Sequence, residues 1–468
     1  MNVETPHIVI AGAGITGLSA AYYLQKTLKE KGQKWRITLL ESSNRLGGKV
    51  KTMIRDGFVM EQGPDSFLER KKSAFELVKD LGLEDQLVRN QTGRAYILHD
   101  DELLPIPEGA VMGVPTKVMP FALTPLVSPA GKVRAAADLV LPRSNVAEGD
   151  DRSVGSFFRH RLGSEVVDRI IEPLLSGIYA GDIDQMSLMS TFPQYAEMEK
   201  KYRSMILGMK SMRAPKPKID KPKGAFLTLK NGLGAIVEEI EAQLEEVQVI
   251  KEEQLKRVEK QEQRYRLYLE QGEPLEADAV ILALPHEVTQ QVLGHADFLK
   301  PLHDRPTSVA TVLLAFSEKE APKTKEGTGF LIPRVEPYTI TACTWTHKKW
   351  PHTTPTGKAL LRCYVGRAGD EEIVYRSDEE IVDVVLSDLK RIMTFHGEPE
   401  FTHVTRWKKA MPQFVVGFPS WLEQLNEQMS VHYPGLFMAG SAYGASGIPD
   451  CIRQGKKAVQ DVIEYLSA

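Results

Sequence analysis

The start of the chain shows two short apolar runs with a helical pattern between them. Residues 7–11 and 37–40 are mostly apolar runs of strand length, and residues 18–31 repeat apolar positions at helical spacing. Nearly continuous apolar runs are typical of strands that are buried on both faces, as in a parallel sheet. The pattern therefore predicts a strand–helix–strand unit at the start of an α/β domain.

Similar runs return far along the chain. Residues 279–285 and 436–440 are predicted as buried strands, and residues near 449 begin a helix with proline at its favoured first turn. We expect these pieces to join the first unit in one discontinuous Rossmann-like domain. Its three segments are residues 1–70, 225–290 and 405–468.

Two other segments separate these pieces. Residues 71–224 are predicted as a mostly helical insertion, and residues 291–404 as a substrate-binding domain. Strand-like runs at 308–316 and 359–365 would form a sheet that floors a substrate chamber, with a helix at about 378–395. The predicted fold class is α/β, with a nucleotide-binding domain, a sheet-floored domain and a helical insertion.

Composition excludes several classes of protein. The chain has 468 residues, 42% hydrophobic and 26% charged, with a net charge of −3. These values are ordinary for a globular protein, and the charge gives no general attraction to nucleic acid. The N-terminus leads directly into the first strand, and no apolar run is long enough for a membrane span. The three cysteines lack metal-site spacing, so we expect a cytoplasmic protein without a structural metal.

The first strand runs directly into a glycine motif. Its residues are Gly12, Ala13, Gly14, Ile15, Thr16 and Gly17. In such a motif the first glycine makes a tight turn, the second lets a pyrophosphate approach, and the third lets helix and strand pack closely. The helix N-terminus supplies N–H groups to the phosphates. Glu41, at the end of the second strand, stands where a ribose-binding acid is expected.

A second group of glycines follows Glu41. Arg45, Gly47 and Gly48 come first, and a Gly63–Ser66 stretch (Gly63, Pro64, Asp65, Ser66) comes next. Dehydrogenases that bind NAD do not need this second pair. The spacing resembles that of amine-oxidase-type flavoproteins, in which it wraps the pyrophosphate and ribose of FAD, with arginine as a fixed cation near the phosphates or the flavin edge. The sequence therefore indicates FAD.

Longer stretches resemble the protoporphyrinogen and coproporphyrinogen oxidases, which belong to the flavin amine oxidase superfamily. The stretches are residues 63–67, 172–182, 187–193 and 447–450. Residues 69–73 and 342–346 look like the coproporphyrinogen III oxidases of Gram-positive bacteria. The resemblance implies FAD-dependent oxidation of coproporphyrinogen III to coproporphyrin III in haem biosynthesis, with oxygen as acceptor and peroxide as product. Protoporphyrinogen IX is the alternative substrate.

The resemblance also implies roles for individual residues. For the flavin they are Ser42, Leu255, Trp407, Gly440, Gly447, Ile448 and Pro449, and for the substrate Lys71, Arg70, Tyr364 and Ile178. Residues 406–417 contain no cysteine for covalent attachment, so noncovalent FAD is expected. No side chain is assigned as a catalytic acid or base, because the flavin is the redox centre. Val111 stands where eukaryotic relatives have an arginine. This chain has no arginine there to pair with a substrate carboxylate, so we expect Lys71 to do so.

Three other functions share these motifs. An amine oxidase would want an aromatic cage, but Ile448 and Pro449 stand where its tyrosine is expected. A carotenoid-type desaturase would share the FAD motifs. A non-enzymatic relative of the Rab-escort type would keep the fold without flavin, and the intact Glu41 and Arg45 argue against it.

Two segments leave their partners open. Residues 105–131 are apolar but interrupted by prolines, so they predict either a membrane-surface or channel-lining element or an internal helix corner. Residues 200–223 are rich in lysine and arginine and predict a basic surface loop. The partners expected are a porphyrinogen, molecular oxygen, the inner face of the cell membrane and neighbouring enzymes of haem synthesis.

Overall fold

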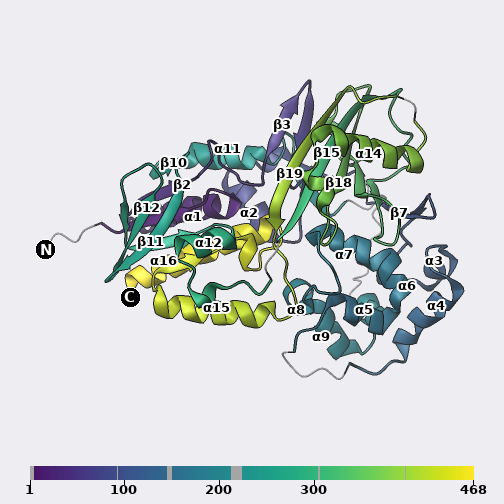
Figure 1. The fold of residues 1–468 in the computed structure, drawn as a ribbon, viewed down its shortest axis with the longest axis horizontal. Coiled ribbons are helices and arrows are strands. Elements are labelled where there is room, and N and C mark those ends of the chain that lie inside the picture. The colour runs from purple at the N-terminus through teal and green to yellow at the C-terminus, as the bar shows by residue number, and fades with distance from the viewer. Residues whose placement is uncertain (1–4, 92, 145–149, 212–223, 304–305, 396) are drawn as a thin grey trace.

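A five-stranded parallel sheet forms the centre of one half of the molecule (Figure 1). The computed structural model describes residues 5–468 apart from 92, 145–149, 212–223, 304–305 and 396, so half of the predicted basic loop lies outside the described residues. The strands in spatial order are β10 (Val247–Ile250), β2 (Arg36–Leu40), β1 (His7–Ala11), β14 (Ala279–Leu282) and β20 (Leu436–Met438). The predicted strand–helix–strand unit and the later buried strands are confirmed.

Both faces of this sheet are covered, which explains its continuous apolar strands. Ile8 and Ile10 point to the face covered by α1 (Ile15–Lys31), α11 (Gly234–Gln243) and α16 (Ile448–Ser467). Val9 and Ala11 point to the opposite face. A three-stranded sheet covers that face together with two helices; these elements are β11 (Leu255–Gln261), β12 (Arg264–Leu269), β13 (Leu275–Ala277), α12 (His286–Val292) and α15 (Phe418–His432).

A seven-stranded sheet forms the upper part of the other half (Figure 1). Its spatial order is β19 (Phe401–Met411), β15 (Thr307–Ser317), β18 (Lys358–Val365), β17 (Ile340–Trp345), β16 (Gly329–Leu331), β7 (Tyr96–His99) and β8 (Glu102–Pro105). The sheet therefore takes strands from residues 71–224 and 405–468 as well as from 291–404. The division of the chain into three domains stays a prediction.

The two faces of this sheet differ in character. One face packs its apolar residues against α14 (Asp378–Ile392) and includes the buried cross-strand pair Cys343 and Cys363. The other face carries Tyr364 and Arg362 on β18 and Thr311 on β15. Trp407 on β19 lies on the same face, two strands away from β18. This second face is the one that looks toward the first half of the molecule.

Most of the regular structure within residues 71–224 is helical. α2 (Lys72–Asp80) packs in the core of the first half of the molecule, beside α16. The helices below the seven-stranded sheet (Figure 1) are α3 (Val118–Leu123), α4 (Pro129–Ala136), α5 (Val154–Leu162), α6 (Ser164–Val166), α7 (Glu172–Tyr179), α8 (Leu188–Thr191), α9 (Pro193–Tyr202) and α10 (Met205–Ser211). A π-helical turn, Val167–Ile171, leads into α7. Within the described residues no helix combines the length and apolar character that crossing a membrane requires.

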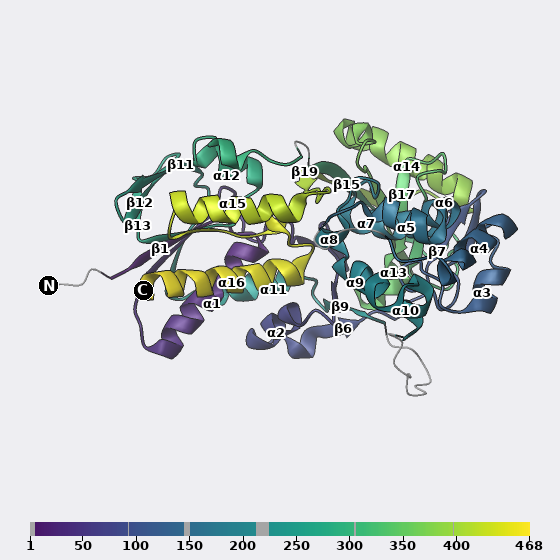
Figure 2. The same cartoon turned by 90° about the horizontal axis from the view of Figure 1, so that it is seen from below.

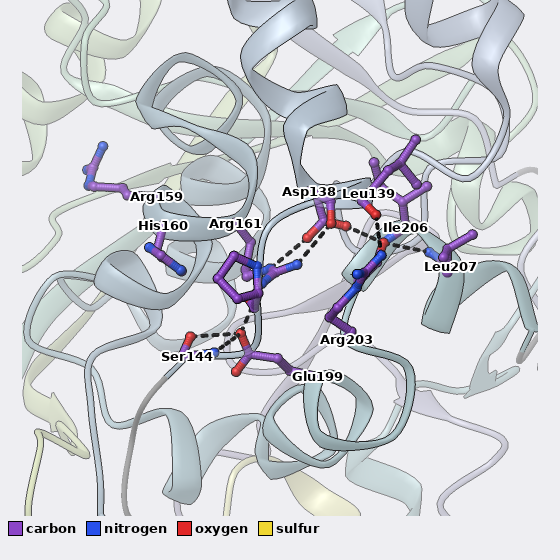
Figure 3. Close-up of polar contacts among 12 residues, drawn as sticks. Asp138, Leu139, Ser144, Arg159, His160, Arg161, Glu199, Arg203, Ile206 and Leu207 are labelled. Carbon is purple, nitrogen blue, oxygen red and sulfur yellow. Dashed lines mark hydrogen bonds and ion pairs between the residues drawn. The ribbon is translucent and has the colours of Figure 1, made fainter.

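A closed ion network lies inside this helical part (Figure 3). Arg161 is fully buried, and its Nε lies 2.6 Å from Oδ1 of Asp138. Its other nitrogens donate to the carbonyl oxygens of Pro142 and Asp138 at 2.7 and 2.9 Å. Asp138 also accepts the N–H of Ile206 at 3.0 Å, and Glu199 lies 3.4 Å from Arg161 Nη1. Arg161 and Asp138 thus satisfy each other and the ends of the surrounding turns.

Two small antiparallel sheets complete the fold. β3 (Thr52–Arg55) pairs with β4 (Phe58–Glu61). β9 (Phe226–Leu229) lies between β5 (Phe67–Leu68) and β6 (Leu87–Arg89). Residues 226–229 therefore form a strand outside the parallel sheet.

Candidate functional site

The glycine motif forms the turn between β1 and α1. A Cβ on Gly17 would lie 1.9 Å from the carbonyl oxygen of Gly12, so only glycine allows this close packing. Gly12 has a φ of 94°, in the left-handed region that glycine adopts at little cost. Gly14 caps α1 without a side-chain hydrogen bond. The first backbone N–H groups of α1 can therefore donate hydrogen bonds to a phosphate.

The second glycine pair packs directly on the first. The N–H of Gly47 donates to the carbonyl of Ala13 at 2.8 Å, and Gly14 and Gly47 form an isolated bridge. A Cβ on Gly48 would come within 3.0 Å of Gly14 Cα. Arg45 donates to the carbonyls of Leu46 and Gly48, so in this structure it holds the loop together. Burial lowers the pKa of Arg45, an effect that the charge of Glu41 opposes. The two motifs form one surface, which we call the glycine cradle.

Glu41 lies beside this cradle. Its Oε2 accepts the N–H of Ala13 at 2.9 Å, and its Oε1 accepts the N–H of Ser43 at 2.9 Å. The carbonyl of Glu41 accepts the N–H of Glu253, which brings Leu255 to the same corner. Ser42 is exposed between them. Glu41 is thus fixed at the edge of the cradle, where a ribose hydroxyl could reach it.

The Gly63–Ser66 stretch meets the inner face of the seven-stranded sheet. Trp407 Nε1 and Thr311 Oγ1 both donate to the carbonyl of Gln62 at 3.0 Å. A Cβ on Gly63 would lie 3.5 Å from the ring of Trp407. This stretch therefore lies at the junction between the two halves of the molecule.

A buried set of charges supports that stretch. Lys349 Nζ lies 2.7 Å from Oδ2 of Asp65, and Arg362 donates to the carbonyl of Gly63. Burial alone would raise the pKa of Asp65, but the charges of Lys349 and Arg362 outweigh it and keep that pKa below its usual range. Burial raises the pKa of Glu61 to about 7, against hydrogen bonds from Leu233 and Thr52. Asp65 therefore stays ionised, whereas Glu61 titrates near neutral pH.

The C-terminal pieces close the site. The N–H of Gly440 donates to Gln454 Oε1 at 2.6 Å, which fixes the loop beside α1. Gly447, with a φ of 97°, caps the N-terminus of α16, and Ile448 and Pro449 form its first turn. Ser73 Oγ donates to the carbonyl of Pro449 at 2.5 Å. The segment after Gly63–Ser66 is thereby bonded to the start of α16.

The predicted substrate residues lie around this junction. Lys71 Nζ lies 2.5 Å from Asp450 Oδ2, so its charge is paired in this structure. Arg70 is exposed just before it. Tyr364 is half-buried on the inner sheet face, and Ile178 on α7 is 48% exposed. The substrate roles of these four residues, and the flavin roles that the resemblance implies, remain predictions.

Sequence reasoning missed four charged residues of the site: Lys49, Glu61, Lys349 and Arg362. Lys49 donates to the carbonyl of Ala410, and burial lowers its pKa. The sequence held one signal, since Arg362 interrupts an otherwise apolar strand at 359–365. A charged residue inside such a run indicates a buried partner. Lys349 gave no comparable signal, because its partner Asp65 is distant in sequence.

The geometry fits a dinucleotide flavin. The cradle leaves no room for side chains but presents helix N–H groups to a phosphate, and Glu41 stands at its edge. The first turn of α16 directs a second set of N–H groups toward Gly447, where negative charge would be stabilised. No three-residue metal cluster occurs at this junction among the described residues; the one such group, His99, Asp100 and Glu336, lies on another surface.

Comparisons with known proteins agree with this site. The family of flavin containing amine oxidoreductases matches residues 15–463. The coproporphyrinogen III oxidase of Bacillus subtilis (strain 168) is 52% identical over 472 residues, which cover 100% of both chains. The coproporphyrinogen III oxidase of Staphylococcus aureus is 43% identical and covers 99% of this chain and 100% of its own.

A solved structure is similar over the same length. The crystal structure of a protein named as a protoporphyrinogen oxidase, from Exiguobacterium sp. 255-15, has a TM-score of 0.89 at 39% identity. It covers 99% of this chain and 100% of its own. The predicted resemblance, fold class and flavin are confirmed by these matches. The chain belongs to the flavin-containing amine oxidoreductase family.

Proposed function

We propose that the protein oxidises coproporphyrinogen III to coproporphyrin III, with FAD bound noncovalently and oxygen as the electron acceptor. The observation that carries the proposal is the full-length similarity to two coproporphyrinogen III oxidases, together with an intact glycine cradle. A bound flavin supplies the acceptor for hydride from the porphyrinogen and passes the electrons to oxygen. The side chains need only to bind, orient and shield the reactants.

Each part of the site has a task in this proposal. The N-terminus of α1 and the cradle bind the pyrophosphate, and Glu41 accepts a hydrogen bond from the adenosine ribose. Gly63 and Trp407 would lie against the flavin ring. The N-terminus of α16 stabilises negative charge at the pyrimidine edge of the ring. Tyr364 and Ile178 would hold the flat apolar body of the porphyrinogen.

The substrate test compares two porphyrinogens. Coproporphyrinogen has four carboxylates and protoporphyrinogen has two, so a site with cations should favour the former. Oxidation of each by the FAD-loaded protein, followed by porphyrin fluorescence, should show a higher kcat/KM for coproporphyrinogen III. A higher value for protoporphyrinogen IX would favour the function in the name of the Exiguobacterium structure. Oxidation of neither would contradict both.

Lys71 is proposed to bind one propionate. Lys71→Ala should raise KM by about tenfold, which corresponds to about 1.4 kcal/mol. Lys72→Ala is the matched control, because Lys72 is exposed on the same helix turn. Because Asp450 already pairs with Lys71, the substrate must compete for that charge. An unchanged KM in Lys71→Ala would remove the role.

The binding mode of FAD has its own test. Acid precipitation should release the flavin into the supernatant, and flavin that remains in the pellet would contradict noncovalent binding. Glu41→Ala should lose about 1.5–3 kcal/mol of FAD affinity through one charged hydrogen bond. Equal affinity in wild type and variant would exclude the ribose contact.

We also propose a cytoplasmic protein that touches an anionic membrane through α3, α4 and the residues that follow α4. Val118, Met119 and Leu123 on α3 are 85%, 68% and 75% exposed, and Val133 and Val140 are each 74% exposed. Both views place α3 and α4 at the end opposite the chain termini (Figures 1 and 2). The exposure supports a surface role for part of residues 105–131 over an internal helix corner.

Vesicle sedimentation tests this contact. The protein should sediment with phosphatidylglycerol vesicles and less with phosphatidylcholine, because Lys117 and Lys132 flank the apolar residues. Leu123→Asp should abolish sedimentation, whereas Val431→Asp, at an exposed valine on α15, should not. Equal sedimentation of both variants would exclude the contact.

Transient association with neighbouring haem-synthesis enzymes is proposed on the same surface, to be tested by crosslinking.

A further inference from the structure

The proposed function leaves two partly buried arginines without a task. Arg334 follows β16, and Arg367 follows β18, three residues after Tyr364. Their side chains are 37% and 11% exposed. The two positive charges lie close enough to repel each other: burial lowers the pKa of Arg367, and the charge of Arg334 lowers it further. Such a pair persists where negative groups compensate it.

The acids around the pair compensate it only in part. Oε1 of Glu172 lies 3.8 Å from Arg334 Nε, and Oδ2 of Asp370 lies 3.5 Å from Arg367 Nε. At these lengths both contacts are ion pairs rather than well-formed hydrogen bonds. Arg334 Nη2 and Arg367 Nε are buried, and neither has a hydrogen-bond partner among the described residues. Buried guanidinium N–H groups normally find an acceptor, so the pair has donors to spare for an anion.

The position of the pair connects it to the proposed substrate. The backbone N–H of Arg334 donates to Glu172, at the start of α7, at 3.3 Å. At the other end of α7, the carbonyl of Ala180 accepts the N–H of Ala368, whose own carbonyl accepts from Arg334 Nη1. α7 is the helix that carries the exposed Ile178. The pair is therefore bonded to the wall proposed for the porphyrinogen, on chain segments separate from Lys71.

We propose that Arg334 and Arg367 form a second carboxylate-binding site, which selects a tetrapyrrole with four carboxylates over one with two. The inference rests on the proposed function. The planar fork of arginine matches a carboxylate through two parallel hydrogen bonds. The proposal places this site and Lys71 at different edges of the bound ring, and protoporphyrinogen has both of its carboxylates on one edge, so it would engage only one of the two sites. Coproporphyrinogen has carboxylates on every pyrrole and can engage both.

Glu172 is part of the selection. It is buried beside both arginines, and burial raises its pKa against the opposing effects of Ser176 and Arg334. A substrate carboxylate at the pair would compete with Glu172 for the same guanidinium groups. Neutralising Glu172 should therefore strengthen binding, which is the opposite of what loss of a merely structural contact would do.

Binding of the fluorescent products tests the proposal without turnover. Coproporphyrin III and protoporphyrin IX are titrated separately into the FAD-loaded protein. Arg334→Gln and Arg367→Gln should each raise the Kd for coproporphyrin III by about tenfold and that for protoporphyrin IX by less than about twofold. Arg376→Gln is the control, because Arg376 is an exposed arginine on a nearby turn. Among the described residues its side chain forms an ion pair only with Glu372. It should change neither Kd.

The variant Glu172→Gln keeps the test decisive if the arginine variants fold poorly. It should lower the Kd for coproporphyrin III by about threefold. An unchanged ratio of the two Kd values in the arginine variants, or weaker binding in Glu172→Gln, would overturn the second site. Wild type that oxidises neither porphyrinogen would overturn the proposed function instead, so the two failures are distinguishable.

Discussion

Arg161 on the one hand, and Arg334 with Arg367 on the other, differ in how completely their guanidinium groups are bonded. Arg161 is fully enclosed, and its bonds to Asp138 and Pro142 use all three of its nitrogens. Arg334 and Arg367 are held by longer ion pairs and each keeps a buried nitrogen without a hydrogen bond in the described residues. The network around Arg161 satisfies its hydrogen-bond donors without a ligand and stabilises the fold. The Arg334–Arg367 pair has hydrogen-bond donors left for a carboxylate.

The strongest test breaks the closed network. Arg161→Met should lower the free energy of unfolding by about 3–5 kcal/mol, because Asp138 would remain buried without its cation, whereas Glu199 keeps its pair with Arg152. Denaturant unfolding of the FAD-loaded protein measures the change. Arg159→Met is the control and should cost about 1 kcal/mol or less, since its pairs with Asp168 and Asp184 are partly exposed. Equal losses would show that burial of the network does not matter.

A second test concerns an acid without a close cation. Within the described residues Glu61 has no ion pair, and its pKa is about 7 in the folded protein against 4.5 in the unfolded chain. Folding therefore favours protonated Glu61, and its contribution to stability is lost as the pH rises through 4.5 to 7. Glu61→Gln should match wild type near pH 4 and be more stable by about 3 kcal/mol at pH 8.

Unfolding of both proteins at the two pH values checks this sign. Asp65→Asn is the contrast, because Asp65 is paired with Lys349 and should lose stability at both values. A Glu61→Gln variant that gains nothing at pH 8 would mean that the carboxylate is solvated in solution.

The third test asks what the open pair contributes to stability. Arg334→Gln and Arg367→Gln should each change the free energy of unfolding by less than about 1.5 kcal/mol, since their bonds are incomplete. The same denaturant measurement applies. Losses as large as that of Arg161→Met would place the pair among the structural networks and remove the reason to seek a ligand there.

The smallest effect comes from opening a closed pair at the site. Asp450→Asn removes the partner of Lys71 and should cost about 0.2–1 kcal/mol of stability, because Lys71 is 36% exposed. The freed ammonium should bind coproporphyrin III about threefold more tightly in the fluorescence titration. Unchanged binding would mean that Asp450 does not compete with the substrate.

The sequence predicted the elements whose signal is local. The strand His7–Ala11 and the strand Leu436–Met438 are where the apolar runs placed them. α1 begins at Ile15 rather than at residue 18, because Gly14 caps it and the glycine in its first turn hid the start. The cradle was predictable because a bound pyrophosphate requires glycines, and the spacing of these glycines along the sequence is typical of a dinucleotide-binding motif.

Long-range pairing could not be predicted in the same way. β7 and β8 join the seven-stranded sheet through a parallel contact with β16, more than two hundred residues later. The arginine pair, the Asp65–Lys349 contact and the Lys71–Asp450 contact each join distant segments. Local pattern carries no information about such partners, and charged residues met singly resemble surface residues.

The order of strands in the parallel sheet has a consequence for how the protein is made. β1 lies between β2 and β14, and the outer strand β20 and helix α16 come from the end of the chain. Contacts between such distant segments form late, because the loops they close are long. The nascent chain can therefore complete its cofactor site only after β20 and α16 have left the ribosome. We expect FAD to bind later than the helices form during refolding. Quenching of flavin fluorescence would report FAD binding, so FAD would stabilise a fold whose helices have already formed.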